Sequence, residues 1–86
     1  MAVVWKQETY VDGELKYEPK YLSEGKLARR FAQALFLNQA GENIELKIIS
    51  CDANYNITAY KLTRQMKDRV VVHIYTMIIE DYKEVI

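Results

Sequence analysis

The side chains with the most obvious capacity for chemistry are the single histidine, His73, and the single cysteine, Cys51. A histidine close to a cysteine can lower the thiol pKa and produce a thiolate nucleophile, and Asp52 could orient the imidazole. However, His73 stands between Val72 and Ile74, inside an apolar segment. This setting is typical of a histidine held in or beside the core, so we expect no catalytic residue.

Metal and phosphate sites are not indicated by the sequence. It has no Cys-x-x-Cys and no His-x₃-His spacing that would hold a structural metal. The three glycines, Gly13, Gly25 and Gly41, are too far apart to form a phosphate-binding loop. The carboxylates are scattered and form no paired-acid motif. We therefore expect a non-enzymatic protein with no cofactor and no metal.

A basic cluster lies between residues 61 and 69. Its members are Lys61, Arg64, Lys67 and Arg69, offset by Asp68, and Arg29 and Arg30 of a separate segment could join them. Such clusters contact phosphates, and Tyr55 or Tyr60 could stack on bases. Solvated turns and sheet edges are normally charged as well, which offers a simpler interpretation. Nucleic-acid binding through this hairpin is thus the alternative function.

Composition limits the class of protein. The 86 residues make one domain, 1–86, and half of them are hydrophobic, as in ordinary globular proteins. Twelve basic residues balance twelve acidic ones, so the formal net charge is zero. This balance does not favour a general nucleic-acid or membrane binder, and it permits self-association. An unpaired cysteine, together with the lack of a signal peptide and of a membrane span, predicts a cytoplasmic protein.

Local signals predict a hairpin followed by a helix. Asp12-Gly13 favours a type I′ turn that pairs Val11 with Glu14, Tyr10 with Leu15 and Glu8 with Tyr17. Pro19 is expected to end the second strand because it cannot donate to a ladder. Over residues 23–40, Ser23 is the expected N-cap and Gly41 the C-terminal stop.

The helix has a wide apolar face. We expect it to dock through Leu27, Phe31 and Leu35, with Arg29, Arg30 and Gln33 on the opposite side. Three strands should follow, over residues 44–50, 57–66 and 70–79, and an acidic tail should form a short extension. The fold class is therefore α+β, with the order β-β-α-β-β-β: a single antiparallel sheet of about five strands with one helix packed on one face.

The strand over residues 70–79 is apolar at both its even and its odd positions. Something should therefore cover the second face of the sheet: a curled sheet plugged by Trp5, a second copy, or another partner. The length of the turn before the strand decides whether Leu62 shares a face with His73 or with Ile74, and the sequence leaves this open.

These features, together with seven tyrosines, predict a small protein-binding module that forms a homodimer. The expected contact residues are Tyr75, His73 and Met77, together with the basic cluster named above. Small size and the lack of motifs suggest a viral, phage or mobile-element inhibitor that acts by occluding a partner protein.

Overall fold

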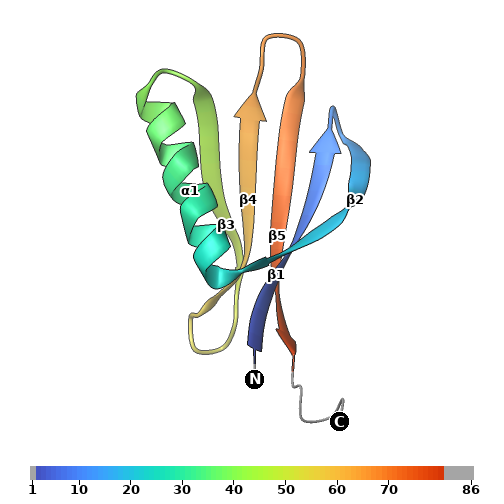
Figure 1. The fold of residues 1–86 in the computed structure, drawn as a ribbon, viewed down its shortest axis with the longest axis vertical. Helices are drawn as coiled ribbons and strands as arrows, with labels where there is room; N and C mark the ends of the chain where they lie inside the picture. Colours follow the sequence, from blue (N-terminus) through green and yellow to red (C-terminus); the bar gives the residue numbers. More distant parts are fainter. Residues whose placement is uncertain (1, 81–86) are drawn as a thin grey trace.

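The computed structural model describes residues 2–80, and the tail expected beyond residue 80 lies outside the described residues. The predicted order β-β-α-β-β-β is confirmed. The elements are β1 (Ala2–Val11), β2 (Glu14–Ser23), α1 (Glu24–Gln39), β3 (Asn43–Cys51), β4 (Ile57–Gln65) and β5 (Val70–Glu80). The chain thus forms one α+β unit (Figure 1).

The five strands form one open antiparallel sheet in the order β2-β1-β5-β4-β3. The helix α1 packs on one face, and β2 curves across the sheet to reach its start (Figure 1). Because β2 and β3 are free edges within this sheet, it does not close on itself, and the curled-sheet alternative is wrong. Trp5 is 5% exposed in the core under the helix, so it does not plug the second face.

The predicted strand pairing of the first hairpin is confirmed near the turn and is wrong farther from it. Asp12 and Gly13 both have positive φ, 51° and 85°, and the pairs Val11–Glu14 and Tyr10–Leu15 form as predicted. The register then shifts near Tyr17, whose φ is 66°, so Tyr17 does not pair with Glu8. The strand β2 also continues through Pro19, which is tolerated because β2 is an edge strand with a bulge.

Both predicted ends of the helix are confirmed. The Ser23 hydroxyl accepts a hydrogen bond from the Lys26 amide at 3.3 Å, which satisfies one free donor of the first turn. At the other end, Gly41 follows the C-cap with φ 102°, a conformation that favours glycine.

The predicted orientation of the helix is wrong in two positions. Leu27 and Ala34 are buried, whereas Leu35 is 61% exposed, and Arg30 is half-buried rather than on the solvent side. A helix turns by about 100° per residue, so two steps of four residues drift by roughly 80°, whereas a step of seven drifts by about 20°. Leu27 and Ala34 therefore face the sheet together, and Leu35 turns toward its margin.

Aromatic packing fills the core between the helix and the sheet. The Phe31 ring meets Tyr60 edge-on with the centroids 4.8 Å apart, and it meets Tyr75 edge-on at 5.4 Å. Such edge-to-face pairs add about 0.5–1.5 kcal/mol each to the gain from burial. The Trp5 ring lies beside Tyr60 with the centroids 5.4 Å apart, so the aromatic layer runs across the three central strands.

The register of the last hairpin places His73 on the helix side. The turn comprises residues 66–69, and Leu62 pairs with His73 across β4 and β5. The opposite side of β5 carries half-buried apolar residues, which we call the second face: Val70, Val72, Ile74 and Ile78. No described residue forms another layer over the second face (Figure 1).

Candidate protein-binding surface

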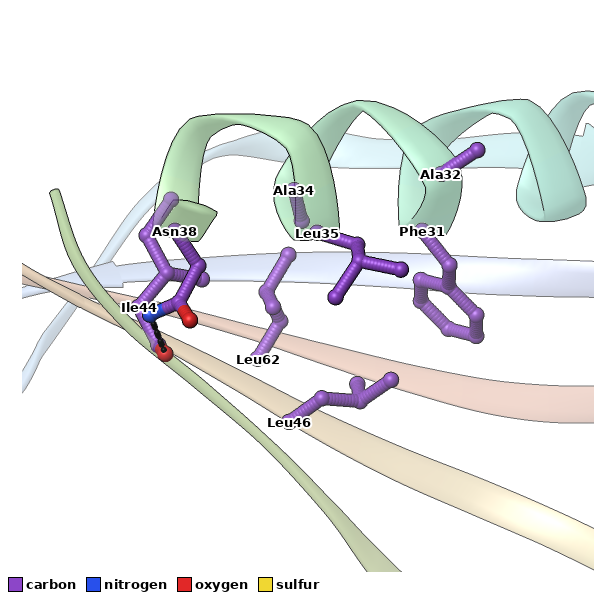
Figure 2. A pocket seen from close by; sticks show the side chains of 8 residues that line it. All are labelled: Phe31, Ala32, Ala34, Leu35, Asn38, Ile44, Leu46 and Leu62. Carbon is purple, nitrogen blue, oxygen red and sulfur yellow. Dashed lines mark hydrogen bonds between the residues drawn. The ribbon is translucent and has the colours of Figure 1, made fainter. Parts of the chain in front are cut away.

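An apolar groove opens between the helix and the edge strand β3, with a volume of about 420 Å³. We call it the α1–β3 groove, and Figure 2 shows the residues that line it: Phe31, Ala32, Ala34, Leu35, Asn38, Ile44, Leu46 and Leu62. Asn38 is the one side chain among them with a polar group. The groove is thus suited to hydrocarbon side chains.

Two hydrogen bonds join the helix to β3 at one end of the groove. The Asn38 Nδ2 group donates to the Ile44 carbonyl at 2.9 Å, shown dashed in Figure 2, and also to the Glu42 carbonyl at 3.2 Å. These bonds fasten the last turn of the helix to the start of β3. The Leu35 side chain projects from the helix toward Leu46, a residue of β3 (Figure 2).

The walls of the groove expose large apolar side chains. Leu35 is 61% exposed and Leu46 is 44% exposed, while the floor residue Leu62 is buried. Ile48, which lies on the same side of β3 as Leu46, is also exposed and extends this surface along the strand. A contiguous apolar patch of this kind on a small domain marks an interaction site.

The outer backbone edge of β3 borders the groove. The strand pairs with β4 on one side, and within the described residues its other side has no partner strand. It contains no proline, and its pairing is regular from Asn43 to Ile48, where the register shifts. Its charged side chains form an exposed ion pair, Lys47 to Glu45 at 3.2 Å. A free edge of this type can accept another strand.

The predicted contact residues on β5 lie under the helix. Tyr75 is completely buried, and Met77 and His73 are partly buried beside the same core. They therefore support the sheet from inside and are not presented on the α1–β3 groove. The sequence could not indicate this because the register of the last hairpin decides which side of β5 faces the helix.

The basic cluster is distributed over different parts of the molecule. Lys67 and Arg69 are exposed in the turn, as expected. Lys61 pairs with Ile74, on the second face, whereas Arg64 pairs with Val71 on the helix side. On the helix, Arg29 is exposed and Arg30 is half-buried. Arg64 also forms an ion pair with Glu42, which neutralises its charge locally. One continuous basic surface is not formed.

The histidine and the cysteine are held apart by the sheet. Cys51 pairs with Ile57, whereas His73 pairs with Leu62, five residues farther along β4. At about 3.4 Å per residue this separates them by roughly 17 Å along the sheet, so they cannot act as a dyad. Among the described residues no cluster of potential metal ligands was found.

His73 titrates in an unfavourable environment for its charged form. Its pKa is lowered, first by burial and then by the positive charges of Arg30, Lys20 and Arg64. Its Nδ1 atom lies 2.9 Å from the Thr9 hydroxyl. The ring is therefore a neutral, hydrogen-bonded group near neutral pH.

Comparison with known protein families, with curated proteins and with solved structures gave no match. In the part of the chain that the structure describes, no helix is long and apolar enough to cross a bilayer.

Proposed function

We propose that this chain is a non-enzymatic protein-binding module that forms a homodimer through the α1–β3 groove and the free edge of β3. The observation that carries the proposal is the pair of exposed leucines, Leu35 and Leu46, which face each other across the groove. They lie beside an edge of β3 that pairs with no other strand of the described sheet. A second copy would cover both features at once.

The sequence of β3 is complementary to itself. If two β3 strands pair antiparallel about Leu46, Leu46 lies opposite the same residue of the second copy, and Ile44 lies opposite its Ile48. Glu45 then lies opposite the Lys47 of the second copy, and Lys47 opposite its Glu45. Cross-strand pairs of opposite charge or of two apolar residues contribute about 0.2–1 kcal/mol each. The strand thus meets a copy of itself with no unfavourable pair in its central five residues.

Neighbouring registers are less favourable. Pairing about Glu45 or about Lys47 puts like charges directly opposite each other, which is destabilising. A shift by one residue puts charged side chains opposite apolar ones, and it sets residues whose backbone groups point outward opposite residues whose groups point inward, so that the hydrogen-bond ladder is lost. Pairing about Leu46 keeps both helices on one face, so that the two α1–β3 grooves adjoin and bury each other's leucines.

A charge exchange provides the sharpest test. Glu45→Lys should weaken the dimer, because it places lysines opposite each other, and adding Lys47→Glu to the same chain should restore it. Sedimentation equilibrium over a concentration series would measure both effects. Failure of the double variant to recover dimerisation would reject the register, and a wild-type mass of one chain at every concentration would reject the homodimer.

A matched pair of leucine variants locates the interface. Leu46→Lys should give a monomer, whereas Leu15→Lys, which changes a comparably exposed leucine on the other edge strand, should leave the dimer unchanged. Because both side chains are already exposed, neither change should unfold the chain. Equal loss of dimer in both variants would place the interface elsewhere.

A module that works through a groove and a strand edge acts by covering protein surfaces, so occlusion of a target is the mode of action that accompanies this proposal. Nucleic-acid binding has less support because Lys61 and Arg64 lie on opposite faces and Arg64 is paired. The viral or mobile-element origin and the cytoplasmic location stay predictions.

A further inference from the structure

A second pocket lies on the helix side of the sheet, between α1 and the strands β1, β2 and β5. It shares no lining residue with the α1–β3 groove and has a volume of about 250 Å³. We call it the His73 pocket. Its walls include Gln7, Thr9, Glu18, Lys20, Arg30 and His73. In contrast to the groove, these residues are polar or charged.

A chain of hydrogen bonds connects His73 to two other residues of this pocket. The Gln7 Nε2 group donates to the Thr9 Oγ1 atom at 3.5 Å, and the same oxygen lies 2.9 Å from His73 Nδ1. A hydroxyl oxygen can accept two hydrogen bonds, so Nδ1 receives the Thr9 proton in one of the two neutral tautomers of His73. That tautomer carries its proton on Nε2, which is the donor that His73 can present to a ligand.

The charges around the pocket are mainly positive. Lys20 comes from β2 and Arg30 from α1, and within the described residues neither forms an ion pair. Glu18 is the acid on the wall, and Arg64, on the far side of His73, is already paired with Glu42. Two cations from different elements thus converge on a neutral donor.

Gln7 brings a buried acceptor to the wall of the pocket. It is 4% exposed, and among the described residues its Oε1 atom has no hydrogen-bond donor. Leaving such an acceptor unsatisfied costs about 1–3 kcal/mol. Because this oxygen is almost closed to solvent, a bound group with a hydroxyl proton reaches it only after a turn of the Gln7 side chain, and the same group must also suit the cations.

We propose that the His73 pocket binds a small phosphate group, either inorganic hydrogen phosphate or a phosphate monoester. The Arg30 guanidinium and the Lys20 ammonium bind its oxyanion, and His73 Nε2–H donates to a third oxygen. After its side chain turns, the Gln7 oxygen accepts from the P–OH group. Phosphate fits this set better than a simple carboxylate does, because it presents several oxygens and one proton at the same time.

Titration with inorganic phosphate at constant ionic strength, followed by ¹H–¹⁵N NMR, tests the proposal. The amide shifts should concentrate at Gln7, Thr9 and His73, and sulfate, which has the same shape without the proton, should bind more weakly. Equal affinity for phosphate and sulfate would overturn the role of Gln7. Shifts spread over all the basic residues would show non-specific charge attraction and overturn the site. A series of small phosphate monoesters then distinguishes the free ion from an ester.

Two neighbouring arginines supply a matched control. Arg30→Gln and Lys20→Gln should each weaken phosphate binding by about tenfold or more, because each removes a charge-assisted hydrogen bond. Arg29→Gln makes the same charge change at the adjacent, exposed position and should leave the affinity unchanged. Equal losses in Arg29→Gln and Arg30→Gln would reject the site. Bound phosphate should also raise the pKa of His73, and Leu46→Lys should not affect phosphate binding.

Discussion

Two leucines on the same helix should differ sharply in their contribution to stability. Leu27 is 5% exposed in the core, and Leu→Ala at such a site costs about 2–5 kcal/mol. Leu35 is 61% exposed, so it buries about two fifths of its surface. Since full burial of a leucine is worth roughly 1.5–3 kcal/mol, Leu35→Ala should cost about 0.6–1.2 kcal/mol in the single chain.

The comparison is made by urea unfolding at a protein concentration at which the chain is monomeric. The slope with denaturant should be the same for both variants, so that the difference in midpoint reports stability alone. The unfolding free energy of the Leu27→Ala variant should be at least about 1 kcal/mol lower than that of the Leu35→Ala variant. Equal losses would mean that Leu35 fills the space beside Leu46, in which case the α1–β3 groove does not exist as described.

Raising the protein concentration extends the same experiment. Because the proposed dimer buries Leu35, Leu35→Ala should become more costly as the wild type dimerises, whereas the cost of Leu27→Ala should not depend on concentration. If the wild type dimerises but the stability lost in Leu35→Ala does not change with concentration, the helix is not part of the interface.

Three further predictions concern buried and charged groups. Tyr75→Phe should stabilise the fold by about 1 kcal/mol in urea unfolding, since the buried Tyr75 hydroxyl has no hydrogen-bond partner among residues 2–80 and leaving one unsatisfied costs about 1–3 kcal/mol; destabilisation would reveal a partner for that hydroxyl. Burial lowers the pKa of His73 below its ordinary 6.5, so the unfolded state binds more protons below that pH; stability should be full above pH 6.5 and fall on acidification, and His73→Gln should flatten this dependence in melting curves taken across the pH range. Reversing the charges of exposed Lys67 and Arg69 should alter the unfolding free energy by no more than about 0.5 kcal/mol, and a larger loss would show that the turn is more than a solvated connection.

Features that depend on neighbours in the sequence could be predicted. The Asp12-Gly13 turn, the Ser23 cap and the Gly41 stop each follow from the conformational preference of one or two residues. The strand alternation over residues 44–48 likewise follows from local pattern, and together these signals establish the order of elements and the fold class.

Features that depend on the position of an element within the sheet could not be predicted. Pro19 does not end β2, because an edge strand can tolerate a missing donor, and the sequence does not state that β2 is an edge. Leu46 has the pattern of a core residue, yet it is exposed because β3 is the other edge. The same limitation hid the polar pocket, whose residues Gln7, Lys20 and Arg30 come from three separate elements.

Both proposed sites follow from a mismatch between the width of one helix and the width of the sheet. Five strands spaced by about 4.8 Å span roughly 19 Å between the outer backbones, whereas a helix with its side chains is about 10–12 Å across. The single helix therefore covers the middle of the sheet with Leu27, Phe31 and Ala34 and leaves a gap on each side. On the β3 side the strand sequence is apolar, and the gap is the α1–β3 groove. On the other side, β1 carries Gln7 and β2 carries Lys20, and the gap is the His73 pocket. Because these gaps share no lining residue, a variant that fills one should leave binding at the other intact, and coupled loss of both would show that the helix shifts as a unit.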